Sequence, residues 1–182
     1  MAVVRSSQRF NEAVKKNKKL RKMRGMLERG AYAIDITQVI RELESLHSTR
    51  KFRSYEVKEV VSSMQKKLME ATVENSSFRS RCVELKMRCF KVSRLLEEHL
   101  GIMRDYLATK YADVLRNEFN TIKDRNAAVN TVLTDFTRLQ HKLETAIKLA
   151  DMVINDMDQA YWSIQLVERT MELNLARKER NI

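Results

Sequence analysis

The chain has 182 residues, which is enough for one domain of ordinary size or one elongated rod. It contains no proline and three glycines, where average usage would give roughly nine and thirteen, so a few long helices are expected in place of many short elements. Charged residues make up 32% of the chain and give a net charge of +11. This balance excludes a disordered composition and suggests a polyanionic partner, such as nucleic acid, an anionic membrane surface or an acidic protein face.

The positive charge is concentrated near the N-terminus. Residues 1–30 hold ten Lys or Arg against two Glu, whereas residues 95–169 hold nine against twelve acidic residues. No stretch reaches the roughly 18 apolar residues that a membrane-spanning helix needs. The two cysteines fall at positions predicted to be buried, as reduced thiols of intracellular proteins do. We therefore expect a soluble, intracellular protein, cytoplasmic or within a large assembly.

A first helix is predicted in the N-terminal segment. Ser6 or Ser7 would cap it, and it would run to about Glu28 with Gly30 as its C-terminal stop. One side of this helix is apolar and the other is strongly basic. The apolar stripe is narrow and breaks around Lys16–Lys19, so the sequence favours a helix here more clearly than a packed one.

A second short helix and a very long one follow. Asp35 would open the short helix, with Gln38 three residues later as a capping-box partner. Residues 47–53 are polar and basic and are predicted to be a connector, after which Ser54 would cap the long helix. Thirteen of fifteen positions at alternating spacings of three and four are apolar or aromatic: Val57, Val61, Met64, Leu68, Ala71, Asn75, Phe78, Cys82, Leu85, Cys89, Val92, Leu96, His99, Met103 and Tyr106. This spacing, which we call the seam, is typical of a helix packed against a partner helix.

The long helix is expected to continue beyond Gly101, with a kink favoured over a break because one glycine costs only about 1 kcal/mol in a helix. A turn is predicted at residues 118–121, followed by a helix that Thr121 caps, with Asp124 in its first turn. This last helix would run to about Arg177. Its seam has thirteen members: Val129, Val132, Phe136, Leu139, Leu143, Ala146, Ala150, Val153, Met157, Ala160, Ile164, Val167 and Met171.

The fold class predicted from these elements is all-α, an elongated helical bundle. Residues 54–182 would form a long antiparallel coiled-coil hairpin as one structural unit, and residues 1–53 a basic N-terminal arm with two short helices. Residues of the two long helices would pair where their numbers sum to about 240. Apolar residues outside the seam demand a further layer, so we expect self-association or incorporation into a larger assembly.

Two clusters of cations are candidate binding surfaces. Residues 5–29, which we call the basic arm, would neutralise phosphates in a salt-dependent manner. Docking of this arm on the acidic section that contains Asp151, Asp156 and Asp158, and a simply solvated face, remain open. The candidate polyanion-binding residues are Arg5, Arg9, Lys15, Lys16, Lys18, Lys19, Arg21, Lys22 and Arg24. A second basic patch is either a binding surface or the solvated flank of a coiled coil, and its members are Arg79, Arg81, Lys86, Arg88, Lys91 and Arg94.

Other residues are candidates for protein contacts or register. Tyr161 and Trp162, with Phe90, are candidate interface aromatics, because such residues often dominate binding energy. Packing of Trp162 beneath the N-terminal helices is an equal alternative. Asn75 lies in the seam, where it would fix the register near Gln165 or mark an exposed end of the seam. Cys82 and Cys89 lie about 10.5 Å apart along one helix, which is too far for a disulfide.

Catalysis is not expected. The three glycines are isolated, so no phosphate-binding loop is present. Glu97 and Glu98 adjoin His99 at the wrong spacing for the Glu-x-x-His pairs of di-iron bundles. We predict a non-enzymatic protein with no catalytic residues, metal site, cofactor or small-molecule substrate.

Three functions are compatible with these features. The favoured hypothesis is a structural or adaptor subunit, a scaffold that acts through helix–helix contacts with protein partners or with itself. The alternative is a nucleic-acid-associated protein that binds phosphates without sequence preference through the basic arm. The third is a peripheral membrane module, in which Phe10, Val14 and Met23 insert while Lys15–Lys22 meet anionic headgroups.

Overall fold

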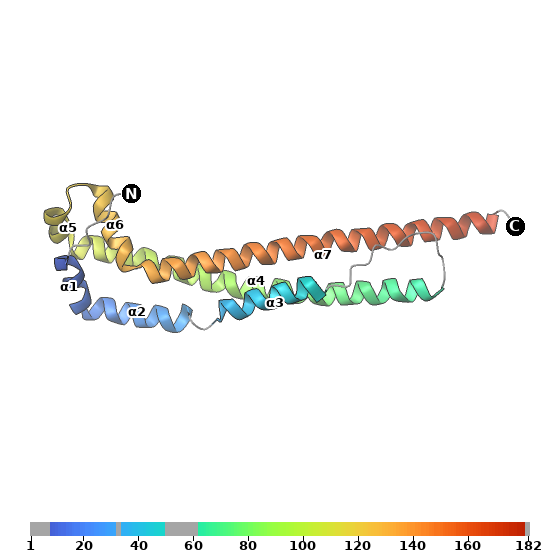
Figure 1. Ribbon diagram of the computed structural model, residues 1–182, viewed down its shortest axis with the longest axis horizontal. Helices are drawn as coiled ribbons and strands as arrows, with labels where there is room; N and C mark the ends of the chain where they lie inside the picture. Colours follow the sequence, from blue (N-terminus) through green and yellow to red (C-terminus); the bar gives the residue numbers. More distant parts are fainter. Residues whose placement is uncertain (1–7, 32–33, 50–61, 181–182) are drawn as a thin grey trace. The chain divides into compact units, whose positions relative to one another are not determined.

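The computed structural model describes residues 8–31, 34–49 and 62–180, and these form helices and short connections with no strand among them (Figure 1). The helices are α1 (Gln8–Lys16), α2 (Lys18–Ala31), α3 (Ile36–Thr49), α4 (Ser62–Lys110), α5 (Ala112–Glu118), α6 (Ile122–Val132) and α7 (Thr134–Arg180). The predicted caps at Ser6, Ser7 and Ser54, the seam positions Val57 and Val61, and the candidate cation Arg5 lie outside the described residues.

The all-α prediction is confirmed, and the two long helices α4 and α7 pack as a helical hairpin. Most seam residues with described side chains are buried, including Leu68, Leu85 and Leu96 of α4 and Met157 and Ile164 of α7. The chain divides into two compact units. Unit 1 comprises Met1–Ile36 and Arg88–Thr145, and unit 2 comprises Thr37–Met87 and Ala146–Ile182.

Unit 1 contains the end of the hairpin where the chain reverses. α4 passes through Gly101 without ending and stops at Lys110. The backbone then deviates at Tyr111, although the amide of Leu115 still donates to its carbonyl at 2.9 Å. α5 follows, and the chain turns between Glu118 and Ile122, where the turn was predicted.

Thr121 is the N-cap of α6, as predicted. Its side-chain oxygen accepts a hydrogen bond from the amide of Asp124 at 3.0 Å. This bond satisfies one of the amides that a helix leaves unpaired in its first turn.

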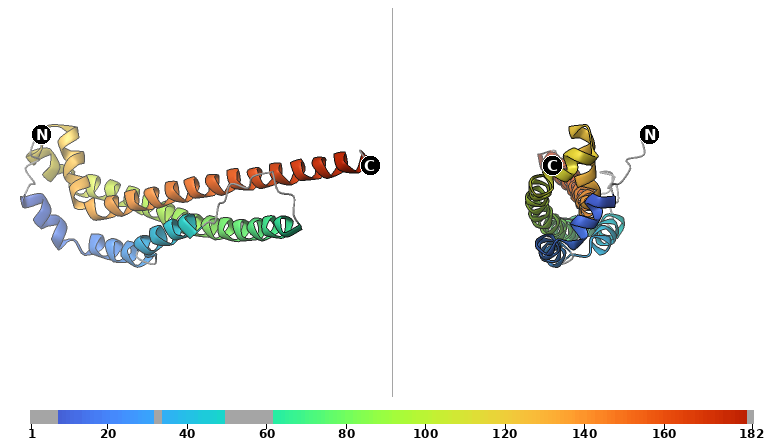
Figure 2. Two further views of the ribbon diagram at one scale, coloured as in Figure 1. Left: turned by 45° about the vertical axis from the view of Figure 1, so that its right-hand side comes forward. Right: turned by 90° about the vertical axis from the view of Figure 1, so that its left-hand side faces the viewer.

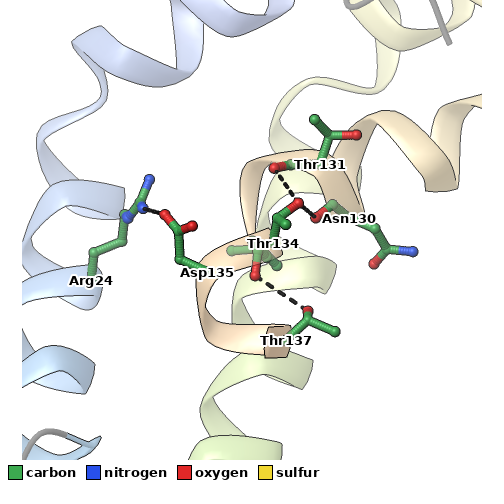
Figure 3. Close-up of polar contacts among 7 residues, drawn as sticks. Arg24, Asn130, Thr131, Thr134, Asp135 and Thr137 are labelled. Atoms are coloured by element: carbon green, nitrogen blue, oxygen red, sulfur yellow. Dashed lines mark hydrogen bonds and ion pairs between the residues drawn. The ribbon is translucent and has the colours of Figure 1, made fainter. Parts of the chain in front are cut away.

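The predicted single C-terminal helix is interrupted at Leu133, which separates α6 from α7 (Figure 3). The amide of Leu133 donates to the carbonyl of Asn130, three residues back, and its side chain is fully buried. The Thr134 hydroxyl donates to the carbonyls of Asn130 and Thr131, at 3.3 and 2.9 Å. These hydroxyl bonds satisfy carbonyls at the end of α6, so the helix can change direction and bury Leu133.

The predicted N-terminal helix is also divided, at Asn17. The Asn17 side-chain oxygen accepts a hydrogen bond from the amide of Leu20 at 3.0 Å and so caps α2. α2 then runs one residue beyond the predicted stop at Gly30, to Ala31. A Cβ on Gly30 would lie 2.8 Å from a methyl of Leu95 in α4, so the glycine permits a close approach of the two helices.

Unit 2 combines α3 with one section of each long helix (Figure 2). Arg81 of α4 donates to Glu42 of α3 at 2.6 Å, and His47 of α3 lies 2.9 Å from a carboxylate oxygen of Asp156 in α7. The connector predicted at residues 47–53 is wrong in its first part, because α3 continues to Thr49. The contact of His47 with Asp156 links the last residues of α3 to α7 and so favours this longer helix.

Asn75 is the one buried polar residue among the described side chains, with 6% of its surface exposed. Its side-chain nitrogen donates to the main-chain carbonyl of Met157 at 2.9 Å. The register therefore differs from the predicted sum of about 240 by several residues, and Gln165 instead donates to the Tyr161 hydroxyl on its own helix. The Asn75 side-chain oxygen accepts no hydrogen bond from the described residues.

We expect Asn75→Leu to raise the free energy of unfolding by about 1–2 kcal/mol, because it removes a buried acceptor that lacks a donor. Urea titration followed by circular dichroism measures this change. Ser76→Leu, at an exposed position of the same helix, controls for the helix propensity of leucine. A loss of stability in Asn75→Leu beyond that of the control would contradict the expectation and show that the bond to Met157 dominates.

Candidate protein interface

The part of unit 2 beyond α3 is a section in which α4 and α7 pack only against each other among the described residues. We call it the open section, residues 66–74 of α4 and 159–177 of α7. Its core consists of Leu68, Ile164 and Met171, with Ala71 and Val167 packed beside them. A two-helix section buries one stripe of each helix and leaves the outer faces in solvent.

The outer faces of the open section carry large apolar side chains. Fourteen large apolar residues of the described chain are exposed, and seven of them lie here: Met69, Val73, Tyr161, Trp162, Leu166, Leu173 and Leu175. Trp162 is 66% exposed and Leu166 is 68% exposed. Such clustering differs from the scattered surface leucines of ordinary proteins and is typical of a protein interaction site.

The structure places the three predicted interface aromatics in different surroundings. Trp162 is not packed beneath the N-terminal helices but lies exposed, with its ring centroid 6.5 Å from that of Tyr161. Phe90 belongs to unit 1 and has the Arg94 guanidinium 5.8 Å from its ring centroid. Tyr161 and Trp162 are therefore neighbours in unit 2, whereas Phe90 belongs to the other unit.

Sequence reasoning missed Leu166 and Leu173 as interface residues. The signal was present, because both lie on the same face of the helix as Trp162, four and eleven residues further on. The inner seam of α7, which includes Ile164 and Met171, is more regular and obscures this second set of apolar residues.

The second basic patch is largely engaged in ion pairs. Arg79 pairs with Asp158 at 2.6 Å, and Lys86 pairs with Asp151, so two cations of α4 meet carboxylates of α7. Arg81 donates to both Glu42 and Glu84 at 2.6 Å. Hydrogen bonds to these carboxylates raise the pKa of Arg79 and of Arg81 above the usual arginine value.

These pairs weigh against a phosphate-binding role for most of the patch. Arg94 also has a partner, Glu97, at 3.6 Å. Arg88 and Lys91 are exposed and have no ion pair with a described residue. Three of the six cations, Arg79, Arg81 and Lys86, therefore link α4 to α7 and α3.

The basic arm is packed by its apolar side. Phe10, Val14, Leu20 and Leu27 are buried in unit 1. The Phe10 ring contacts Tyr111 edge to face, with centroids 5.7 Å apart. The stripe that appeared too narrow to pack is thus complete, and burial of each of these side chains contributes about 1.5–3 kcal/mol.

Polar contacts anchor the same segment. The Asn17 amide donates to the hydroxyls of Tyr106 and Tyr111 at 3.1 and 2.8 Å, and Tyr111 donates to the carbonyl of Ala13 at 3.1 Å. Arg24 reaches Asp135 of α7 at 3.8 Å, as Figure 3 shows, and lies over the ring of Phe136.

The remaining described cations of the arm point to solvent. Exposed members of the predicted set are Arg9, Lys15, Lys16, Lys18, Lys19, Arg21 and Lys22. Of these, Lys19 lies over the Tyr106 ring at 4.8 Å and Arg21 donates to the carbonyl of Lys15. Packing of the apolar side therefore leaves these seven cations of α1 and α2 exposed to solvent.

The acidic section that the sequence suggests for docking of the arm has other partners. Asp151, Asp156 and Asp158 all lie in unit 2 and pair with Lys86, His47 and Arg79. Docking in unit 1 depends instead on the apolar stripe and on Asn17.

The two thiols have the character of core residues. Burial raises the pKa of Cys82, with a smaller contribution from the Glu42 carboxylate, and burial also raises the pKa of Cys89. A raised pKa keeps both thiols protonated and poorly nucleophilic near neutral pH. No group of three metal-binding side chains occurs within the described residues.

A shallow groove of about 680 Å³ follows one face of α4. Its lining residues are Thr72, Val73, Ser76, Ser77, Ser80, Arg81 and Glu84. The hydroxyls have no His or Cys beside them among these residues, so the groove offers no activated nucleophile.

No described helix combines the length and the hydropathy needed to cross a membrane. Comparison of the chain with family models, with curated proteins and with solved structures finds no match.

Asn17→Ala is expected to lower the free energy of unfolding by about 1–3 kcal/mol, because the cap of α2 and two bonds to tyrosines are lost together. Urea titration measures the change, and trypsin should cut the basic arm faster. Asn17→Asp retains the capping oxygen but not the donated bonds, so its effect should be intermediate. If Asn17→Ala behaves like Lys22→Ala, an exposed control on the same arm, the anchoring role is wrong.

Proposed function

We propose that the chain is a non-enzymatic structural or adaptor subunit that acts through helix–helix contacts in a larger or self-associated assembly. The observation that carries this proposal is the exposed apolar surface of the open section. Trp162, Leu166 and Leu173 of α7 and Met69 and Val73 of α4 are all more than half exposed. Burying such a side chain fully against another helix contributes about 1.5–3 kcal/mol.

Other features support the same proposal. Arg79, Arg81 and Lys86 are ion-paired with carboxylates of the same unit, and Cys82 and Cys89 are buried thiols. The protonated thiols fit an intracellular, reducing compartment. Ion pairs of Arg79 with Asp158, Arg81 with Glu42 and Lys86 with Asp151 link the helices of unit 2.

A second candidate function is sequence-independent binding of nucleic acid by the basic arm. The observation that favours it is the separation of the two sides of the arm, with the apolar side buried and seven cations exposed. Such a surface would bind phosphates and release counterions.

Two of the three residues that would insert under the membrane hypothesis are buried. Phe10 is 1% exposed and Val14 is 6% exposed, so both are committed to the core of unit 1. Insertion would require the arm to leave Tyr111 and Asn17 of the same unit, at the cost of the packing described above.

The interface proposal is tested by photocrosslinking in cells that produce the protein. The full chain carrying Trp162→p-benzoylphenylalanine should form covalent adducts larger than the chain itself, because the ring would lie within reach of whatever covers the open section. Electrophoresis and mass spectrometry identify the adducts. The matched control is Ile122→p-benzoylphenylalanine, at an isolated apolar residue of α6 that is 73% exposed. Absence of adducts at Trp162, or equal adducts at both positions, would remove the proposal.

The nucleic-acid candidate is tested by fluorescence anisotropy with labelled single-stranded DNA, duplex DNA and RNA at two salt concentrations. Binding should weaken steeply with salt and fall at least tenfold in Lys15→Glu/Lys18→Glu/Lys22→Glu, which reverses three exposed charges. The control is Arg88→Glu/Lys91→Glu, at the unpaired cations of the second patch. Equal losses in the two variants, or no binding by the wild type at low salt, would exclude the arm as a specific phosphate-binding surface.

A further inference from the structure

A second regular stripe runs along the outer face of α7 in unit 2. Its members alternate in spacings of three and four: Met152, Asn155, Gln159, Trp162, Leu166, Arg169, Leu173 and Ala176. All eight side chains are exposed. Trp162 lies two residues from both Ala160 and Ile164 of the buried inner seam, so it is turned about 200° around the helix from each.

This outer stripe has the spacing of a packing seam. A 3-4 alternation of apolar residues is typical of a helix that lies along a partner helix. Five of the eight members are apolar and include the central pair, Trp162 and Leu166. The inner seam of α7 already packs on α4, as the burial of Met157, Ile164 and Met171 shows. The outer stripe is therefore a second, partly apolar face of α7, and the described residues of this chain do not cover it.

The charges of the open section favour a second copy of the chain as the occupant. The whole chain carries +11, so most approaches between two copies are repulsive. The open section is neutral, because four cations (Lys66, Lys67, Arg169 and Arg177) are balanced by four carboxylates (Glu70, Glu74, Glu168 and Glu172). Two copies can meet there without net electrostatic repulsion, whereas a strongly acidic or basic partner would gain little electrostatic attraction.

Twofold symmetry makes the stripe complementary to itself. Two copies of α7 that run antiparallel about an axis between Trp162 and Leu166 pair all eight members. The facing pairs are Trp162 with Leu166, Gln159 with Arg169, Asn155 with Leu173, and Met152 with Ala176. The central layers bury both tryptophans against leucines, and Arg169 can donate to the side-chain oxygen of Gln159.

We propose that the chain forms an antiparallel homodimer through this outer stripe of α7. The inference rests on the proposed helix–helix function and names its partner as a second copy. Each open section then gains the third and fourth helices that it lacks, and the two hairpins form a four-helix section with Trp162 near its centre.

The dimer is tested with the purified full chain by sedimentation equilibrium over a wide range of concentrations. The mass should rise from 21.4 kDa towards twice that value. Trp162 is the only tryptophan, so its emission should shift to shorter wavelength over the same range as its ring leaves water. Trp162→Ala should weaken dimerisation at least about 30-fold, as the loss of a central aromatic does, and Trp162→Glu/Leu166→Glu should abolish it.

The matched control is Ile102→Glu/Ile122→Glu, which adds the same charge at residues of unit 1 that are 50% and 73% exposed. This control should dimerise like the wild type, and circular dichroism should show equal helix content in all variants. A wild type that stays monomeric with unshifted emission overturns the dimer, as does a dimer that survives Trp162→Glu/Leu166→Glu or is lost equally in the control. A monomer that still gives crosslinked adducts with another protein in cells overturns the dimer alone, whereas the absence of any adduct also removes the proposed function.

Discussion

Burial of the seam between α4 and α7 is the interaction on which the other features depend. Leu85 and Leu96 of α4 and Met157 and Ile164 of α7 belong to the most buried part of the chain, and each such side chain contributes about 1.5–3 kcal/mol. A seam of this kind fixes which face of each helix is inside. It therefore also fixes which residues are left outside, and both candidate surfaces follow from that division. The outer stripe of α7 is exposed because the inner stripe is occupied.

Periodicity in the sequence was sufficient to predict the helices and the faces that they bury. The turn and the Thr121 cap were also predictable, because Thr followed three residues later by Asp is a local signal. The interruptions at Asn17 and Leu133 were not. Asn17 caps α2 while its amide meets two tyrosines about ninety residues away, and sequence spacing carries no information on such a contact. Leu133 ends α6 because its buried side chain and the Thr134 hydroxyl outweigh the helical preference of the segment.

The candidate site was predictable in kind but not in detail. Tyr161 and Trp162 were recognised because aromatic residues outside a seam are conspicuous. The ion pairing of the second basic patch was not predictable from the sequence. Arg79 and Lys86 can be recognised as paired cations only when the register of α4 against α7 is known. A shift of a few residues in that register would separate them from Asp158 and Asp151. Charge counts along a sequence therefore overstate the positive surface wherever cations and carboxylates of different helices meet.

The two cationic segments differ in what their charges do, and this difference separates the two candidate functions. In unit 2 the cations of α4 are matched by carboxylates, so the surface there is close to neutral and its exposed groups are apolar. In unit 1 the arm buries its apolar residues and leaves its lysines in water without described carboxylate partners. An apolar, neutral surface selects another helix, whereas a cationic one selects phosphates. Because the surfaces belong to different units and share no residue, a protein contact at Trp162 and a phosphate contact at Lys18 can exist independently, and each can be removed without disturbing the core that supports the other.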